Sequence, residues 1–299
     1  MFGKFLDPKN DVAFKKIFGT TKNQDILIHF LNDMLVFKEG KPITKVTFLK
    51  TVQDPDIAAK KTSIVDIMCT DELGNQYIVE MQVAQGDEFI KRAQYYAAKA
   101  YSSQLKVAEQ YHTLKEIIFL AITNFIMFPE KEEFKSDHVI LDKLTNEHDL
   151  KDFSFTFLEL AKFKKSKEEL GSIIDRWSYF FKHADETSEQ DLVEIIGKDP
   201  IIQRAYEELN QFSWSAEELS SYEAEIKREK DNQAVLIKQL ATHYSEGIAE
   251  GEARGEAREY KKSRVDIAKK LLKQNVAVNI IVDATGLTIQ QIEQLRETE

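Results

Sequence analysis

The sequence predicts a mixed α/β sheet flanked by helices and followed by a helical C-terminal region. Three observations lead to this fold class. Residues 63–83 contain two β-prone runs around a polar five-residue loop with a glycine, which is typical of a hairpin. Residues 116–122 (EIIFLAI) form a nearly continuous apolar run, the pattern of a strand buried on both faces. From about residue 166 onward the apolar spacing becomes helical.

The segment before the hairpin predicts two helices and one strand. Asp7 and Pro8 suit the N-cap and the first position of a helix that runs to Phe18, with Gly19 beyond its end. A second, amphipathic helix is expected over residues 23–37. Residues 43–52 are expected to form the first strand.

The segment after the hairpin predicts one long helix, over residues 87–110, and then two strands, over residues 116–122 and 155–163. One broad face of the helix is marked by spacings of three and four: Arg92, Tyr95, Tyr96 and Lys99. Aromatic residues at this spacing usually belong to a core, so Tyr95 is expected to be buried.

Further helices are expected over residues 167–183, 189–197, 200–212 and 215–241. Ser215 and Glu218 have the spacing of a capping box at the start of the last of these helices. Glycines then recur every four residues in a Glu- and Ala-rich stretch, which favours a helical linker. Two short helices joined at Gly286 indicate a helix-turn-helix-like unit, which would contact either protein or DNA.

Composition limits the class of protein. The chain has 299 residues, 42% hydrophobic and 31% charged, enough for one large core with appendages or for two domains. No run approaches the roughly 18–20 apolar residues needed to cross a bilayer, and the N-terminus lacks the apolar core of a signal peptide. The single cysteine, Cys69, cannot form an internal disulfide. We therefore expect a cytoplasmic protein with no membrane partner.

The net charge of −10 counts against a nucleic-acid partner, but the charge is unevenly distributed. Residues 1–128 carry 16 Lys and Arg against 15 Asp and Glu, so the acidic excess belongs to the remainder of the chain. A nearly neutral N-terminal region can still present a local basic strip to a phosphate backbone.

The hairpin carries two acids that should face each other. If the loop is residues 71–75, Thr70 pairs with Gln76, and counting outward places Asp66 opposite Glu80. Opposed carboxylates repel at roughly 4.5–5.5 Å between Cβ atoms. A divalent cation with oxygen ligands would turn this repulsion into attraction. The alternative is a partly exposed hairpin whose acids point into water or meet lysines.

A family resemblance favours the metal. Asp66, followed on the next strand by Glu80-Met81-Gln82, resembles the Asp…(Asp/Glu)-x-Lys core of PD-(D/E)XK nucleases, in a Glu-x-Gln form. Residues 11–19 (DVAFKKIFG) and 92–96 (RAQYY) extend the similarity. Together these segments resemble the Rpn group of recombination-promoting nucleases, often described as PD-(D/E)XK family transposases. The similarity covers nearly the whole chain and is strongest through residue 125.

The resemblance implies a restriction-endonuclease-like sheet and a site for Mg²⁺ (or Mn²⁺). Asp66, Glu80 and Gln82 are then the catalytic residues, and Asp66, Glu80 and the backbone carbonyl of Met81 hold the metal. The nuclease class places a lysine where Gln82 stands, so either the activity is slow or Lys60, Lys61 or Lys91 supplies the cation. The candidates for accessory residues or DNA contacts are Asp11, Lys15, Lys60, Lys61, Lys91 and Arg92. Asp11 and Lys15, four residues apart, could also simply pair on the surface.

The function implied is a Mg²⁺-dependent DNA endonuclease acting in recombination, mobile-element biology or defence against foreign DNA. The alternative is a nuclease-fold protein without turnover that acts as a DNA- or protein-binding adaptor. The partner expected is DNA, with no small-molecule cofactor, and a homo-oligomer formed through the C-terminal helices. We expect four segments: a nuclease domain (1–165), a helical region (166–242), a helical linker (243–262) and the small module (263–299).

Overall fold

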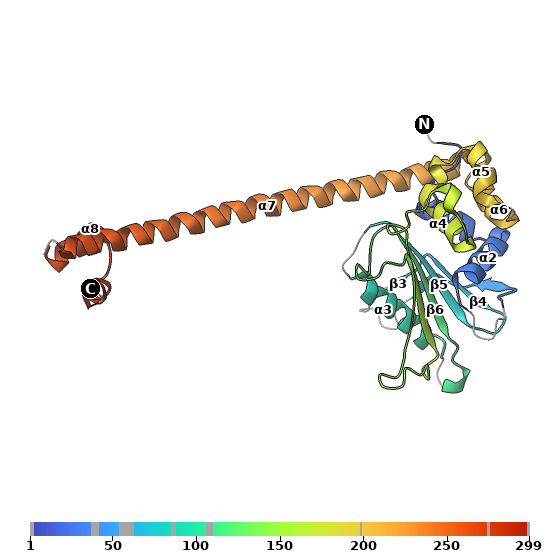
Figure 1. The fold of residues 1–299 in the computed structure, drawn as a ribbon, viewed down its shortest axis with the longest axis horizontal. Helices are drawn as coiled ribbons and strands as arrows, with labels where there is room; N and C mark the ends of the chain where they lie inside the picture. The colour runs from blue at the N-terminus through green and yellow to red at the C-terminus, as the bar shows by residue number, and fades with distance from the viewer. Residues whose placement is uncertain are drawn as a thin grey trace. The chain divides into compact units, whose positions relative to one another are not determined.

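The computed structural model forms two compact units, Met1–Lys227 and Arg228–Glu299. Helix α7 (Ala216–Lys273) begins in the first unit and ends in the second. The structure describes residues 3–36, 42–53, 63–84, 88–105, 110–197, 199–273 and 276–297. The first unit contains the sheet and the helices around it (Figure 1), so it is the unit that positions the candidate site.

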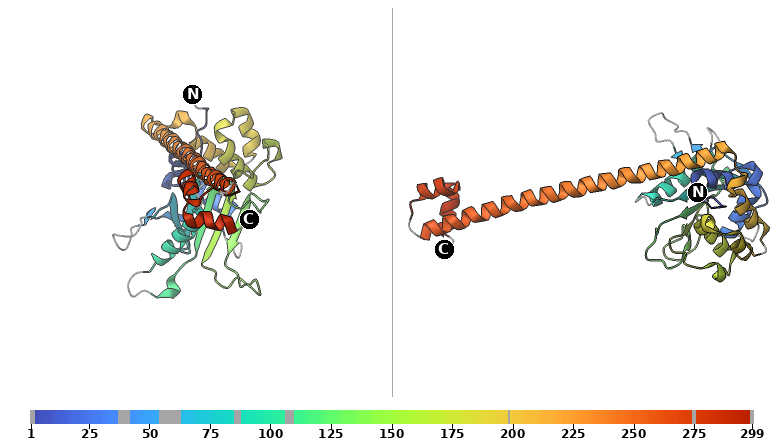
Figure 2. Two further views of the ribbon diagram at one scale, coloured as in Figure 1. Left: turned by 90° about the vertical axis from the view of Figure 1, so that its left-hand side faces the viewer. Right: turned by 90° about the horizontal axis from the view of Figure 1, so that it is seen from above.

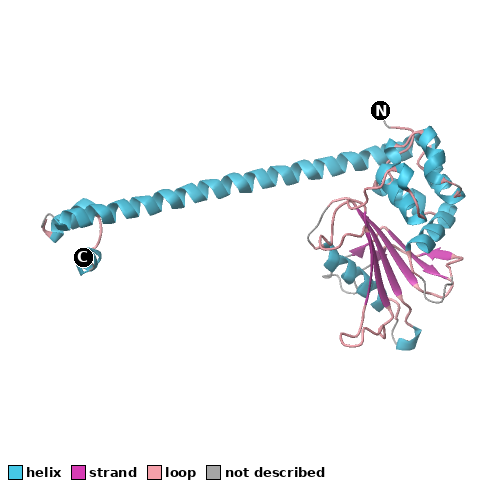
Figure 3. Ribbon diagram, viewed as in Figure 1, coloured by secondary structure: helices cyan, strands magenta, loops and turns pink. Residues whose placement is uncertain are grey.

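The first unit is organised around a six-stranded mixed sheet with the strand order β1-β4-β5-β6-β8-β7, drawn in magenta in Figure 3. Strands β5, β6 and β8 are parallel, and the outer pairings of β1 with β4, β4 with β5 and β7 with β8 are antiparallel. The strands are β1 (Val46–Phe48), β4 (Ile67–Asp71), β5 (Gln76–Gln82), β6 (Ile117–Thr123), β7 (Lys135–Val139) and β8 (Phe153–Glu159). The predicted α/β class is therefore confirmed.

Some predicted strands were placed differently. The expected strand over residues 43–52 is divided between β1 and β2 (Val52–Gln53), and β2 pairs with β3 (Ser63–Ile64) in a separate two-stranded ribbon. Strand β7 was not expected, because its sequence KSDHV has little of the apolar alternation of a half-buried strand. It lies at the edge of the sheet and, among the described strands, pairs with β8 alone. Most of its side chains are not buried, so the strand does not need apolar alternation. All seven residues of β6 are buried, as its apolar run predicts.

The hairpin has the predicted register, with Thr70 paired to Gln76. Its turn is held by Asp71, whose carboxylate accepts hydrogen bonds from the backbone N–H groups of Leu73 and Asn75 at 2.9 Å each. Gly74 adopts φ +88°, a conformation that residues with a Cβ rarely take. Strand β4 starts at Ile67, so Asp66 lies in the bend just before the first paired residue.

One face of the sheet is covered by helices from both ends of the first unit. These are α1 (Asp11–Phe18), α2 (Gln24–Met34), α4 (Ile173–His183), α5 (Glu189–Ile196) and α6 (Pro200–Glu208). Their aromatic rings interlock: the ring centroids of Phe30 and Phe18, and of Phe30 and Trp177, lie 5.1 Å apart. Because these helices share one hydrophobic core with the sheet, the boundary expected at residue 165 falls inside a single compact unit.

The opposite face is covered by α3 (Phe89–Ser102), which connects the parallel strands β5 and β6 (Figure 1). The helix turns three small buried residues toward the sheet, Ala93, Ala97 and Ala100. They pack in one cluster with Ile78 and Phe119 of the sheet. This helix is shorter than the expected range of residues 87–110, and the segments 85–87 and 106–109 lie outside the described residues.

Side-chain hydrogen bonds to backbone N–H groups set the first residue of two helices, α1 and α7. Helix α1 begins at Asp11 and not at Pro8, because the side chain of Asn10 accepts from the N–H groups of Val12 and Ala13 and so provides the N-cap. The capping box at the start of α7 is present as predicted: Ser215 N–H donates to Glu218, and Glu218 N–H donates to Ser215 Oγ.

The second unit has a small core of its own. Helices α8 (Val278–Thr285) and α9 (Ile289–Glu297) bury Ile281 and Ile292 against Ala268 near the end of α7. Figure 2 shows these two helices, in red, beside that end. The turn between them places Gly286 at φ +61°, as a left-handed C-cap. The predicted linker over residues 243–262 is continuous helix within α7. None of the described helices is long and apolar enough to cross a membrane.

Candidate active site

The two acids of the hairpin meet where β4 begins and β5 ends. Ile78 packs in the core beneath α3 and Val79 in the core of the opposite face, so alternation along β5 places Glu80 on the α3 side of the sheet. Asp66 precedes β4 and lies opposite Glu80 when the observed register is continued by one residue beyond Ile67. Hence both predicted acids lie at the same end of neighbouring strands.

Asp66 is tied to β5 by two hydrogen bonds. Its carboxylate Oδ2 accepts from the backbone N–H of Met81 at 2.9 Å, and its own N–H donates to Glu80 Oε1 at 3.2 Å. The carbonyl of Gln82 accepts from Asn124 on the β6 side. Because consecutive strand residues direct their N–H and C=O groups to opposite edges, the carbonyl of Met81 faces the edge on which Asp66 lies. The Asp66 carboxylate and the Met81 carbonyl therefore lie on the side of β5 that faces β4. Glu80 also reaches that side, because its Oε1 accepts from Asp66 N–H.

Glu80 is almost completely buried, with 3% of its surface exposed. Its register partner on β6 is Ala121, which offers no polar side-chain group. The carboxylate instead accepts one hydrogen bond on each oxygen, from Asp66 N–H on Oε1 and from the Gln82 amide, at 2.9 Å, on Oε2. Each oxygen keeps a further lone pair with which it can bind a cation.

The electrostatics of this pair disfavour two negative charges. Burial raises the pKa of Asp66 to about 6, although the N–H of Met81 partly opposes the shift. Burial, and then the charge of Asp66, raises the pKa of Glu80 to about 8. A buried pair of carboxylates with raised pKa values is the electrostatic condition that a bound divalent cation would relieve.

Helix α1 brings a cation and a third acid to Asp66. Lys15 Nζ lies 2.7 Å from Asp11 Oδ1 and 4.0 Å from Asp66 Oδ1. The charge of Asp11 also contributes to the raised pKa of Asp66, and that of Lys15 opposes it. The i,i+4 pair expected as a possible surface feature is thus present, and it lies beside the acids.

Gln82 and Arg92 form the other side of the site. The guanidinium Nη2 of Arg92, on α3, donates to Gln82 Oε1 at 2.6 Å. Gln82 in turn donates to Glu80, so both ends of its amide are engaged. Sequence reasoning proposed Arg92 near the acids but did not find this link, because ten residues and a change of element separate Arg92 from Gln82 in the chain.

The remaining candidates from the sequence are Lys91, Lys60 and Lys61. Lys91 is exposed on α3. Lys60 and Lys61 lie outside the described residues. Tyr95, expected in the core, is 47% exposed, which corrects that prediction. Its neighbour Tyr96, which sequence reasoning did not select, is half-buried; burial raises its pKa, and the charges of Glu80 and Asp66 add to the shift.

The donor set suits a hard cation. Among the described residues, no group of three or more His, Cys, Asp or Glu side chains is arranged to hold a metal. Mg²⁺ is usually bound by one or two carboxylates together with water and substrate phosphate. The two carboxylates and the Met81 carbonyl, all oxygen ligands at one edge, therefore fit Mg²⁺ or Mn²⁺ and do not resemble a zinc site.

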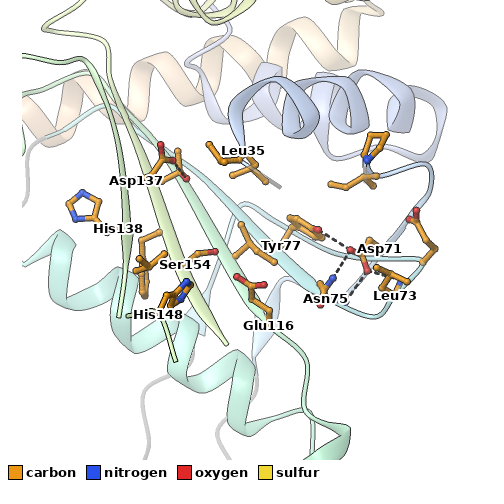
Figure 4. Close-up of a pocket in the computed structure, with 18 residues that line it drawn as sticks. Leu35, Asp71, Leu73, Asn75, Tyr77, Glu116, Asp137, His138, His148 and Ser154 are labelled. Atoms are coloured by element: carbon orange, nitrogen blue, oxygen red, sulfur yellow. Dashed lines mark hydrogen bonds between the residues drawn. The ribbon is translucent and has the colours of Figure 1, made fainter. Parts of the chain in front are cut away.

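A separate pocket of about 600 Å³ lies at the opposite end of these strands (Figure 4). Leu35, Tyr77, Glu116 and His148 are among its lining residues, and the Tyr77 hydroxyl donates to Asp71 at 2.8 Å. Tyr77 is the second residue of β5 and Gln82 is the last, and the pocket shares no lining residue with the acids. The pocket is therefore separate from the two acids.

The mixed sheet with its flanking helices is an α/β fold of the PD-(D/E)XK-like type. The chain belongs to the PD-(D/E)XK nuclease family transposases, whose family model matches residues 8–239. That range contains the whole sheet, the helices around it and the first part of α7. Neither the comparison with curated proteins nor the comparison with solved structures found a significant match.

Proposed function

We propose that this protein is a divalent-metal-dependent DNA endonuclease that hydrolyses phosphodiester bonds. One observation carries the proposal. Glu80 is buried and Asp66 is half-buried beside it, both have raised pKa values, and hydrogen bonds fix their carboxylates where β4 begins and β5 ends. A fold stabilised for its own sake gains nothing from two opposed buried acids. A site that binds a cation needs them.

In this proposal Asp66, Glu80 and the Met81 carbonyl hold Mg²⁺ (or Mn²⁺). When bound, the metal polarises the phosphate and lowers the pKa of a bound water. Lys15, at 4.0 Å from Asp66, supplies positive charge on the α1 side. Lys91 on α3 is the described candidate for DNA contact, Arg92 on the same helix is a candidate accessory residue beside the acids, and Lys60 and Lys61 remain candidates from the sequence.

The biological setting proposed is recombination, transposition-like mobility or defence against foreign DNA in the cytoplasm. DNA is the partner, and no small-molecule cofactor is proposed. We further propose that the C-terminal helices mediate self-association, with residues 263–299 acting as a protein-contact module. The family supports the nuclease class and a DNA substrate, and the remainder rests on the site and on the sequence pattern.

A plasmid-nicking assay tests the proposal. Wild-type protein should convert supercoiled plasmid to nicked and linear forms with Mg²⁺ or Mn²⁺ and not with EDTA. Asp66→Asn should bind DNA with unchanged affinity and leave the plasmid intact. Wild-type protein without cleavage under any metal would contradict the proposal.

A second candidate function is a DNA- or protein-binding adaptor without turnover. The observation that favours it is the neutral Gln82, at the position where PD-(D/E)XK nucleases as a class carry lysine, with its amide engaged by Glu80 and Arg92. In that case wild type and Asp66→Asn would bind DNA equally, and neither would cut it. The same assay therefore separates the two functions.

A further inference from the structure

The amide of Gln82 connects the guanidinium of Arg92 to the carboxylate of Glu80. Arg92 Nη2 donates to Gln82 Oε1 at 2.6 Å, and Gln82 Nε2 donates to Glu80 Oε2 at 2.9 Å. A guanidinium has only N–H donors, so the amide oxygen must face Arg92. The amide NH₂ must then face Glu80. Arg92 thus sets the orientation of the Gln82 amide, and therefore which of its groups donates to Glu80.

Arg92 is held in a position suited to this role. It is half-buried, and its guanidinium carbon lies 5.0 Å from the centre of the Phe89 ring, one turn earlier on α3. None of the ion pairs found between described residues involves Arg92, and within the same part of the chain its buried Nε has no hydrogen-bond partner. Its charge is therefore directed toward the acids, and Arg92 lowers the pKa of both Glu80 and Asp66.

We infer that Arg92 is a positioning residue that acts through Gln82, and that the two residues function as one unit for placing positive charge on Glu80. This inference rests on the proposed function for its activity readout. A lysine at residue 82 would place its ammonium against the guanidinium of Arg92, and two cations in a half-buried site repel. Lysine at position 82 is therefore compatible with the site only when residue 92 is neutral.

The test is a double-mutant cycle with Gln82→Lys, Arg92→Met and the double variant, all in the full-length chain. Each single variant should lower kcat for plasmid nicking by about tenfold to a hundredfold, the range for one lost hydrogen bond to a charged group. The double variant should recover activity above both single variants. Gln94→Met, an exposed change on the same helix, is the matched control and should be unaffected.

Two further measurements make the outcome decisive. Titration calorimetry with Mg²⁺ alone should show weaker binding for each single variant and recovery in the double variant, which tests the unit even if no cleavage is found. DNA affinity in EDTA should be the same for wild type and Arg92→Met. The inference is overturned if the effects of the two substitutions are additive, or if Gln82→Lys retains full activity and Mg²⁺ affinity. It is also overturned if Arg92→Met lowers DNA affinity and its salt dependence, since that would make Arg92 a phosphate contact.

Discussion

The backbone N–H of Asp66 donates to the carboxylate of Glu80 at 3.2 Å, while the carboxylate of Asp66 accepts from the strand that carries Glu80. Each carboxylate therefore accepts from a backbone N–H: Glu80 accepts from Asp66, and Asp66 accepts from Met81, the residue after Glu80. This arrangement fixes both carboxylates in the absence of a cation. Side chains that are already fixed lose less conformational entropy when a cation binds to them.

Removing either charge should stop catalysis without unfolding the protein. Asp66→Asn and Glu80→Gln keep the size of each side chain, and Asn keeps an oxygen that accepts from Met81 N–H. We expect metal-dependent nicking to fall by about a hundredfold to a thousandfold or more. The melting temperature without metal should hold or rise, because the buried repulsion is relieved. Calorimetry in EDTA measures it.

Asp71→Asn is the contrasting variant in the same hairpin. Asp71 accepts from two backbone N–H groups, from the Asn75 side chain and from the Tyr77 hydroxyl. We expect it to cost about 1–3 kcal/mol of stability, since donors lose a charged acceptor, and to leave the rate of the folded protein unchanged. The opposite pattern, with stability lost in the Asp66 and Glu80 variants, would identify those two acids as structural.

The stability of the metal-free protein should fall as pH rises. Folding raises the pKa of Asp66 to about 6 and that of Glu80 to about 8, against unfolded values of about 3.9 and 4.3. The folded state therefore binds more protons than the unfolded state between pH 4 and pH 8, and stability decreases across that window. Urea unfolding in EDTA at several pH values measures this slope. Glu80→Gln should flatten it, most clearly between pH 6 and 8, and an equal slope in both proteins would contradict the assignment.

Lys15 should matter more for the rate than for the fold. Its ammonium lies between Asp11 and Asp66 and is 43% exposed, so it stabilises the fold little. We expect Lys15→Met to lower kcat by about tenfold to a hundredfold through lost electrostatic stabilisation. Lys22→Met, which removes an exposed lysine paired with Glu208, is the control. Equal rates for the two variants would exclude Lys15 from the mechanism.

Removal of residues 243–299 should lower the number of subunits in the assembly, as measured by light scattering, and leave most cleavage intact. The site lies entirely in the first unit, and the family match ends at residue 239. If the tail reads DNA instead, the truncated protein will keep the same number of subunits, lose DNA affinity and show a weaker dependence of affinity on salt.

The sequence was informative where one local pattern decided the structure. The register of the hairpin follows from turn chemistry and alternation, so Asp66 and Glu80 could be placed together before the fold was known. The buried run of β6 and the capping box of Ser215 and Glu218 are equally local. Each of these features depends on residues less than twenty positions apart.

The rest depends on tertiary contacts that no local pattern encodes. Strand β7 forms only because β8 offers an edge, and the helices after residue 166 join the N-terminal helices because their aromatic rings fill one core. The environment of Gln82 was equally inaccessible, because Arg92 reaches it from another layer of the fold. The exposure of Tyr95 shows the same limit, since helical spacing locates a face but not what covers it.

The alanine face of α3 links the packing of the core to the chemistry. Ala93, Ala97 and Ala100 allow the helix to lie close to the sheet, and Arg92 stands next to the first of them. A bulkier residue at Ala97 would lift the helix, and the contact between Arg92 and Gln82 would open by a similar amount. Under the proposed function, substitutions that touch neither substrate nor site would thus change the rate, because the packing distance between α3 and the sheet sets how closely the half-buried Arg92 approaches Gln82.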